Sequence, residues 1–458
     1  MNNEALAHSV RFLQSWLPLR YAREQIPGFV VGVAHQGTPL LLEAYGHADV
    51  ERGTALRPDH IFRIASHSKT FTGTALMLLV EDGRIRLDDR VAAHLPWLSD
   101  AGDPRWREVT VRQLLSHGAG VIRDGVEKDY WHLSRAFPDA EALRRELLAT
   151  GLVLDPNVQM KYSNYGYSLL GMVVEAVSGM PYNRFVTERI IRPLGLSDTY
   201  PEYAPELDGR LATGYGRRER GTRRPIAHVS THGMSAATGF CATASDLLAY
   251  FTAHMVGSGR LLQDASKREM QRVEWHAHQP GQPSRTDYGL GLILDQVGDR
   301  HLFGHSGGFP GFITRSMADP KDELVVVALT NCVDGPASAI SDAVWKIIDH
   351  FQTHDGEGGP APDLARYEGH YTNLWGTTSI VALGDRLVAA HPDSWEPFAS
   401  VETLERGEGE DTFVIAETSS FGSAGEPVRF QVRDGRVETV DYTGTIMWPD
   451  AVWLERNA

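Results

Sequence analysis

The sequence has few cysteines and no long apolar run, and each absence excludes a class of protein. Two cysteines, Cys241 and Cys332, are too few for a disulfide framework in a chain of 458 residues. No stretch reaches the roughly 20 apolar residues that a membrane-spanning helix needs. The first 20 residues lack the basic start, apolar region and cleavage site of a secretory signal. We therefore expect a cytoplasmic protein without a membrane partner.

Basic residues are fewer than acidic ones, with 44 lysines and arginines against 59 aspartates and glutamates and a formal net charge of -15. A protein with this charge repels nucleic acids and anionic membrane surfaces, so a nucleic-acid partner is excluded. The content of 42% apolar and 22% charged residues is typical of a globular protein. The chain is too long for one hydrophobic core and is expected to form about two or three domains.

The part of the chain up to residue 355 mixes strand and helix patterns. Residues 27–49 are typical of two strands around a tight turn, and residues 301–331 of later strands. Helices are expected after Lys69 with an end near Gly83, and at 168–180, at 244–255 with Ser245 or Asp246 as the cap, and at 340–353. These patterns predict an α/β domain over residues 1–355 whose sheet takes strands from both ends of the segment.

The composition changes near residue 354. The stretch HDGEGGPAPD is rich in glycine, proline and acidic residues, which predicts a linker, assigned to residues 356–364. Residues 365–458 then alternate apolar and polar residues around Gly-Asp and Asp-Gly turns, as hairpins do. We expect a small all-β domain there, either a barrel or a sandwich.

One of only six lysines follows a serine by three positions, in the stretch IASHSKTFTG. On a helix, positions i and i+3 share a face, so Ser66 rather than Ser68 can meet the Lys69 amine. A serine hydroxyl needs a neighbour that takes its proton, and a buried lysine with a lowered pKa can do so. Ser66 at a helix start would also lie near free backbone N–H groups that stabilise an oxyanion.

Two further motifs strengthen this interpretation. Tyr162-Ser163-Asn164 precedes a predicted helix, and His305-Ser306-Gly307, followed by Gly308, lies on a late strand. The three motifs in this order resemble those of the serine β-lactamase and penicillin-binding-protein superfamily. Within it, residues 25–355 are similar to the branch of class C β-lactamases, D-stereospecific aminopeptidases, DD-carboxypeptidases and related esterases.

This resemblance implies a fold and a set of roles. The fold is α+β, with an antiparallel sheet of a five-stranded type, flanking helices, an all-helical region and, as in D-aminopeptidase-like relatives, a C-terminal lipocalin-like barrel. Ser66 would become acylated, Lys69 would take or relay its proton, and Tyr162 would act as general acid and base. No cofactor or metal is implied. The remaining site residues, expected to bind the substrate or the oxyanion, are Asn164, His305, Ser306, Gly307 and Gly308.

The sequence departs from the β-lactamase pattern at His305. A lysine at this position is permanently charged and holds a substrate carboxylate, whereas an unperturbed histidine is mostly neutral at pH 7. Relatives with histidine include D-aminopeptidases and esterase-like proteins. The predicted substrate is therefore a D-amino-acid-containing peptide or amide, or else a small ester. Three alternatives stay open: an acyltransferase, a β-lactamase or DD-peptidase, and an inactive binding module.

Other histidines are interpreted as structural. His67 lies beside Ser66 on another helix face, and His117 belongs to a turn that resembles one in the family. His228, His232, His276 and His278 lack the spacing of a metal-binding motif, so no metal site is expected. Neither the exact substrate nor the oligomeric state follows from the sequence, and a homo-oligomer is left open.

Overall fold

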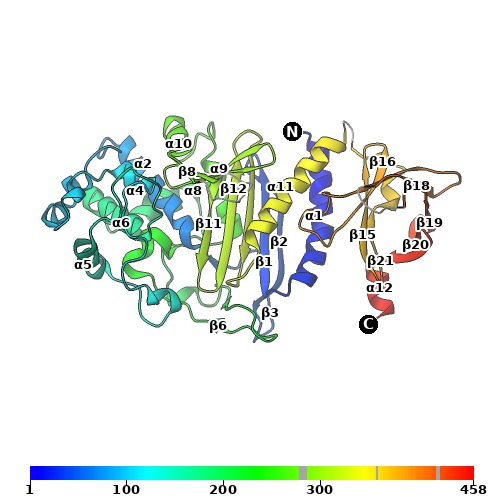
Figure 1. Cartoon of the computed structure of the whole chain (residues 1–458), viewed down its shortest axis with the longest axis horizontal. Coiled ribbons are helices and arrows are strands. Elements are labelled where there is room, and N and C mark those ends of the chain that lie inside the picture. The colour runs from blue at the N-terminus through cyan, green and yellow to red at the C-terminus, as the bar shows by residue number, and fades with distance from the viewer. Residues whose placement is uncertain (278–285, 357–358, 419–422, 458) are drawn as a thin grey trace. The chain divides into compact units, whose positions relative to one another are not determined.

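The computed structural model describes residues 1–277, 286–356, 359–418 and 423–457 (Figure 1). Contacts divide the chain into two compact units, Ile26–Ser341 and Met1–Gln25 together with Asp342–Ala458. The boundary predicted from composition, at 356–364, stays a prediction. Residues 357–358 of that linker lie outside the described residues, as do His278 and residues 419–422 and 458.

The unit Ile26–Ser341 is built on an antiparallel sheet, as expected. Within the described residues the sheet has nine strands in the order β3-β2-β1-β13-β12-β11-β10-β9-β8, so the expected five-stranded type was too small. The two additional strand pairs of this unit are β4 with β7 and β5 with β6. The strands are β1 (Gly28–His35), β2 (Thr38–Asp49), β3 (Thr54–Ala55), β4 (Phe62–Arg63), β5 (Gly214–Tyr215), β6 (Pro225–Ile226), β7 (Cys241–Ala242), β8 (Trp275–Ala277), β9 (Thr286–Tyr288), β10 (Ile293–Val297), β11 (Arg300–Phe309), β12 (Phe312–Asp319) and β13 (Leu324–Thr330).

The first and last long strands of this unit are neighbours in the centre of the sheet. β1 pairs with β13 in antiparallel register, with Val31 opposite Ala328. Both strands are almost continuously apolar and buried, as strands covered on both faces are. The prediction that the sheet takes strands from both ends of the segment is confirmed.

Helices surround this sheet and form an all-helical region beside it (Figure 1). Two short turns accompany the helices: the 3₁₀ turn η1 (Ala65–His67), directly before α2, and the π-helical turn η8 (Ser235–Gly239). The cap of the helix at 244–255 was predicted wrongly: the side chain of Thr243, not Ser245 or Asp246, accepts the Asp246 N–H at its start. The helices are α2 (Ser68–Glu81), α3 (Val91–His94), α4 (Val111–Leu115), α5 (Ala140–Thr150), α6 (Asn164–Ser178), α7 (Tyr182–Val186), α8 (Arg192–Leu194), α9 (Ala244–Ala253) and α10 (Asp264–Met270).

Helix α2 is buried along nearly its whole length although it contains several threonines. Thr70 and Thr74 donate their hydroxyl protons to backbone carbonyls one turn earlier, which removes the cost of burying these groups. The helix then ends at Glu81, just before Gly83 with its positive φ of 69°, close to the predicted end. This buried helix fixes Ser66 and Lys69 at its N-terminal end.

The other unit contains a closed eight-stranded barrel, so the all-β prediction is confirmed in its barrel form. Apolar side chains including Tyr367, Leu387 and Phe430 form its core. The elements are α1 (Asn3–Glu24), α11 (Ala337–His354, which begins in the other unit), β14 (Gly369–Asn373), β15 (Gly376–Leu383), β16 (Arg386–Ala390), β17 (Glu402–Arg406), β18 (Thr412–Glu417), β19 (Pro427–Arg433), β20 (Arg436–Tyr442), β21 (Thr445–Pro449) and α12 (Asp450–Arg456). No helix in the described parts of the chain has the length and apolar character to cross a bilayer.

Candidate active site

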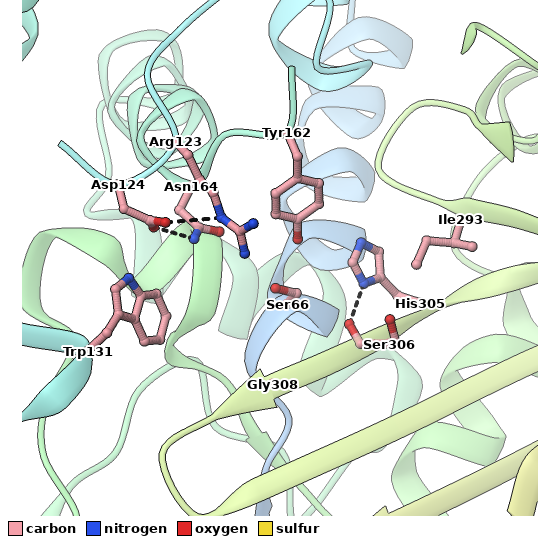
Figure 2. A pocket seen from close by; sticks show the side chains of 10 residues that line it. All are labelled: Ser66, Arg123, Asp124, Trp131, Tyr162, Asn164, Ile293, His305, Ser306 and Gly308. Atoms are coloured by element: carbon pink, nitrogen blue, oxygen red, sulfur yellow. Dashed lines mark hydrogen bonds and ion pairs between the residues drawn. The ribbon is translucent and has the colours of Figure 1, made fainter. Parts of the chain in front are cut away.

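The three sequence motifs meet at one cavity of about 420 Å³ in the unit Ile26–Ser341 (Figure 2). Ser66 comes from the turn before α2, Tyr162 and Asn164 from the start of α6, and the third motif from β11. Figure 2 shows Ser66 between two sides of this cavity, with the tyrosine above it. The lining residues are Ser66, Arg123, Asp124, Trp131, Tyr162, Asn164, Ile293, His305, Ser306 and Gly308.

The backbone around Ser66 is tightly held. Ala65 has a positive φ of 48°, a conformation that L-residues other than asparagine and aspartate adopt rarely. Ser68 Oγ donates to the Ala65 carbonyl at 2.6 Å and accepts the Phe240 N–H at 3.1 Å. A Cβ atom at Gly307 of β11 would lie only 2.2 Å from the Ile64 carbonyl oxygen. Only glycine therefore lets this strand pass so close to the turn that carries Ser66.

The Lys69 amine lies next to the Ser66 hydroxyl. Lys69 Nζ is 3.2 Å from Ser66 Oγ, 2.7 Å from Asn164 Oδ1 and 2.9 Å from the Ala237 carbonyl oxygen. The side chain is fully buried, and burial lowers its pKa well below the ordinary value. A neutral amine has two N–H donors and one lone pair. Asn164 Oδ1 and the Ala237 carbonyl oxygen can only accept hydrogen bonds, so the two N–H groups of the neutral amine donate to them. The lone pair of the amine is then left to accept the Ser66 proton.

Asn164 is oriented by a carboxylate behind it. Its Nδ2 group donates to Asp124 Oδ1 at 2.6 Å, so its Oδ1 atom faces Lys69. The Asp124 side chain is only 7% exposed, and its other oxygen pairs with Arg123 Nε at 3.1 Å. The amide orientation is thus determined by partners of fixed polarity on both sides.

Tyr162 is half-buried, and its hydroxyl faces Ser66 (Figure 2). Its ring centroid lies 4.8 Å from Lys69 Nζ and 4.2 Å from the centroid of the His117 ring. Burial raises the pKa of Tyr162, so the phenol keeps its proton at neutral pH. The side chain can therefore donate a proton in the cavity. His117 Nδ1 accepts the Ser163 N–H at 3.1 Å, which holds this segment in place.

The His305 ring uses both of its nitrogens within the protein. Nδ1 donates to the Ser306 carbonyl oxygen at 2.6 Å, and Nε2 accepts from the Tyr288 hydroxyl at 3.2 Å. Burial, together with the neighbouring Lys69 and His67, lowers the pKa of His305 well below its ordinary value. This residue therefore brings no positive charge to the cavity.

Comparison with known proteins agrees with this arrangement. Residues 13–348 match the family model described as Beta-lactamase. The chain belongs to the beta-lactamase family. This membership agrees with the resemblance seen in the sequence.

This family member is similar to one curated protein and to two solved structures, among others. Protein Flp of Staphylococcus aureus (strain MW2) is 24% identical over 332 residues, which cover 72% of this chain but only 63% of Flp. The octameric penicillin-binding protein homologue from Pyrococcus abyssi has a TM-score of 0.66 and 23% identity, over 96% of this chain and 99% of that one. D-amino acid amidase from Ochrobactrum anthropi SV3 has a TM-score of 0.63 and 26% identity, over 75% and 98% of the two chains.

Several cavity residues of this beta-lactamase family member were not predicted. Arg123, Asp124 and Trp131 lie on the segment after the turn at His117, and the Ala237 carbonyl comes from the π-helical turn η8. None of the first three belongs to a sequence motif identified above, so no local pattern marked them as cavity residues. A carbonyl supplied by a π-helical turn has no sequence signature.

His67 and His276, both interpreted as structural, have protein partners. His67 Nε2 lies 3.0 Å from Ser316 Oγ and its Nδ1 2.9 Å from the Ile64 carbonyl oxygen. His276 pairs with Asp287 at 2.8 Å. Across the described residues, no group of three or more histidine, cysteine, aspartate or glutamate side chains is arranged to hold a metal ion.

Proposed function

We propose that the protein hydrolyses an amide or ester through a Ser66 acyl-enzyme. The observation that carries this proposal is the 3.2 Å separation between Ser66 Oγ and the fully buried Lys69 Nζ. In the first step, Ser66 Oγ attacks the substrate carbonyl and its proton moves to Lys69. Asn164 and the Ala237 carbonyl hold the amine so that its lone pair is directed to the serine.

The tetrahedral intermediate needs donors for its oxyanion. The backbone N–H groups of Ser66 and Gly308 serve this role, and each such donor contributes about 3 to 4 kcal/mol to transition-state stabilisation. Ser66 lies in a helical first turn, where N–H groups have no partner within the helix. Gly307 permits β11 to approach this turn, which brings Gly308 to the cavity.

The intermediate collapses when the leaving group receives a proton. Tyr162 supplies it, because its raised pKa keeps the phenol protonated, and it regains a proton from the Lys69 ammonium. The leaving amine or alcohol then departs and the acyl group stays on Ser66 Oγ. In deacylation, the attacking water gives one proton to Tyr162 while Tyr162 passes its own proton to the neutral Lys69 amine. The Lys69 ammonium then protonates Ser66 Oγ as the acid product leaves, which restores the starting state.

The proposed substrate is a peptide or amide that contains a D-amino acid, with a small ester as the second choice. The amidase from Ochrobactrum anthropi supports the amide because it shares the fold at 26% identity. A β-lactamase or DD-peptidase function has less support, because the neutral His305 provides no cation for the carboxylate at the third motif. An acyltransferase would use the same acyl-enzyme, with an acceptor other than water.

The experiment compares wild type with Ser66→Ala on p-nitrophenyl esters, D- and L-aminoacyl p-nitroanilides and nitrocefin. A fluorophosphonate probe should label wild type at Ser66, and the variant should lose both labelling and at least 1,000-fold in kcat/KM, as expected for loss of a nucleophile (about 4 kcal/mol). Product mass spectra with and without added amines and alcohols separate hydrolysis from acyl transfer. Equal rates for wild type and variant would refute the proposal.

We also propose the type and role of the barrel, the location of the protein and its oligomeric state. The barrel is lipocalin-like, and it shapes the substrate range, mediates assembly or is a passive appendage. The protein acts in the cytoplasm. It forms a homo-oligomer, for which the octameric relative from Pyrococcus abyssi offers a precedent.

A further inference from the structure

The cavity contains one exposed cation. Among the described residues that line it, Arg123 and Asp124 are the charged side chains, because His305 is neutral. The Arg123 side chain is 61% exposed, whereas Asp124 is 7% exposed. A substrate that enters the cavity therefore meets the guanidinium group rather than the carboxylate.

The guanidinium group is held in place on one side only. Its Nε atom pairs with Asp124 Oδ2 at 3.1 Å, and its central carbon lies 5.4 Å from the centroid of the Tyr162 ring. Its terminal nitrogens make no hydrogen bond to any residue that the structure describes. Figure 2 shows this end of the side chain between Asp124 and Tyr162, on the side of the cavity where Ser66 lies. The two terminal NH₂ groups thus remain available to a planar anion.

Asp124 is not available for a substrate cation. One of its oxygens accepts from Asn164 and the other pairs with Arg123. A substrate ammonium group would approach the exposed guanidinium and find no unpaired carboxylate among the described lining residues. The cavity therefore disfavours an unprotected amino group on this side.

We propose that Arg123 is a specificity-determining residue that binds a carboxylate of the substrate, on the side of the cavity opposite His305. This inference rests on the proposed acyl-enzyme chemistry at Ser66. The substrate class becomes an amide or ester that also carries a carboxylate: a monoester or monoamide of a dicarboxylic acid, or a D-peptide that is acidic or N-acylated. Because the net charge of -15 repels anions at long range, recognition depends on this local cation.

The test uses p-nitrophenyl monoesters of adipic, pimelic and suberic acid beside the neutral esters of equal chain length. Wild type should prefer at least one acidic ester by about tenfold or more in kcat/KM, and the preference should weaken as the ionic strength rises. In Arg123→Gln the acidic-to-neutral ratio should fall at least about tenfold, and Arg123→Lys should keep part of it. The ratio is the readout because it cancels effects on the shared chemical step.

A binding experiment separates this proposal from the proposed function. Adipic acid monoamide and hexanamide are titrated into Ser66→Ala and into the double variant with Arg123→Gln. Tighter binding of the acidic amide that depends on Arg123 supports the carboxylate site even if no ester is hydrolysed. Wild-type hydrolysis without an acidic preference, or a ratio unchanged in Arg123→Gln, overturns the carboxylate site and leaves the acyl-enzyme proposal standing.

Discussion

At the scale of single residues, two charges of opposite sign act on the Lys69 amine. Burial is the main cause of its low pKa, the Asp124 carboxylate raises that pKa again, and the Arg123 guanidinium lowers it. Asp124 and Arg123, which together orient Asn164, therefore also adjust the pKa of Lys69, the proposed base. This coupling arises because Asp124 contacts both Asn164 and Arg123.

The charge on Asp124 should affect the pH dependence of kcat/KM, because it raises the pKa of Lys69. If neutral Lys69 is the base, kcat/KM rises as the pH increases through its pKa. Asp124→Asn keeps an acceptor for Asn164 but removes the charge that raises the Lys69 pKa, so the acidic limb should move to lower pH. Arg123→Gln should move it to higher pH. The measurement is kcat/KM for one neutral ester from pH 4 to 10.

These two variants control for each other. A general loosening of the cavity would lower the rate in both without moving the limbs in opposite directions. Limbs that stay in place, or that move in the same direction in both variants, would show that Lys69 does not supply the titrating group. Circular dichroism at each end of the pH range excludes unfolding as a cause.

At the scale of elements, the sequence predicted those parts that local patterns determine. The two strands around the tight turn (β1 and β2), the apolar run of α2 and the hairpins of the barrel all appear where expected. Lys69 and Ser66 lie together as their i, i+3 spacing predicted, although Ser66 belongs to the turn η1 and Lys69 to the first turn of α2. Asp124 was missed because its contact with Asn164 joins residues 40 positions apart, and no local pattern encodes such a contact.

A second element-scale contact joins α1, the end of α11 and the segment before β14. His8 Nδ1 lies 2.9 Å from Asp355 Oδ2, and His8 Nε2 lies 2.9 Å from Glu368 Oε1. Burial alone would lower the pKa of His8, but the hydrogen bonds and charges of Glu368 and Asp355 outweigh it, so the pKa is raised. The protonated ring donates to both carboxylates and connects three segments.

This contact predicts a pH-dependent stability. Because the folded pKa of His8 lies above the unfolded value of 6.5, its stabilisation is fully present below pH 6.5 and is lost as the pH rises through the folded pKa. His8→Gln should therefore lower the free energy of unfolding by about 1 to 3 kcal/mol at pH 6, and by less at pH 9. Urea unfolding of wild type and variant across this range measures the difference.

The matched control is His354→Gln, a substitution of an exposed histidine at the end of α11. Its stability relative to wild type should change little across the same pH range. If the cost of His8→Gln were the same at every pH, or greater at high pH, the protonated contact would be excluded.

At the scale of the whole molecule, the N-terminal helix belongs with the barrel although the chain separates them by more than 300 residues. Trp16 Nε1 of α1 donates to the Pro392 carbonyl oxygen at 2.9 Å, and Phe12 packs against Phe398 with their ring centroids 5.0 Å apart. The linker composition near residue 356 marks a change of secondary structure. That composition could not reveal this grouping, because Pro392 and Phe398, which contact α1, lie in a loop without a distinctive sequence pattern.

The grouping predicts that the barrel is not a dispensable appendage. Deletion of residues 364–458 would uncover Phe12 and Trp16, which are buried in the intact chain and contact this segment. Exposed apolar faces of this kind promote association, so the truncated chain should aggregate or lose at least about 5 °C in Tm.

The control is a shorter deletion that ends the chain at Asp450. Helix α12 buries no residue, and Asp450 is kept because its side chain accepts a hydrogen bond from Thr372. This shorter deletion should keep the wild-type Tm and a single species in size-exclusion chromatography. A truncated chain that stays monodisperse with an unchanged Tm would show that α1 is stable without the barrel, and that residues 364–458 form a separate domain.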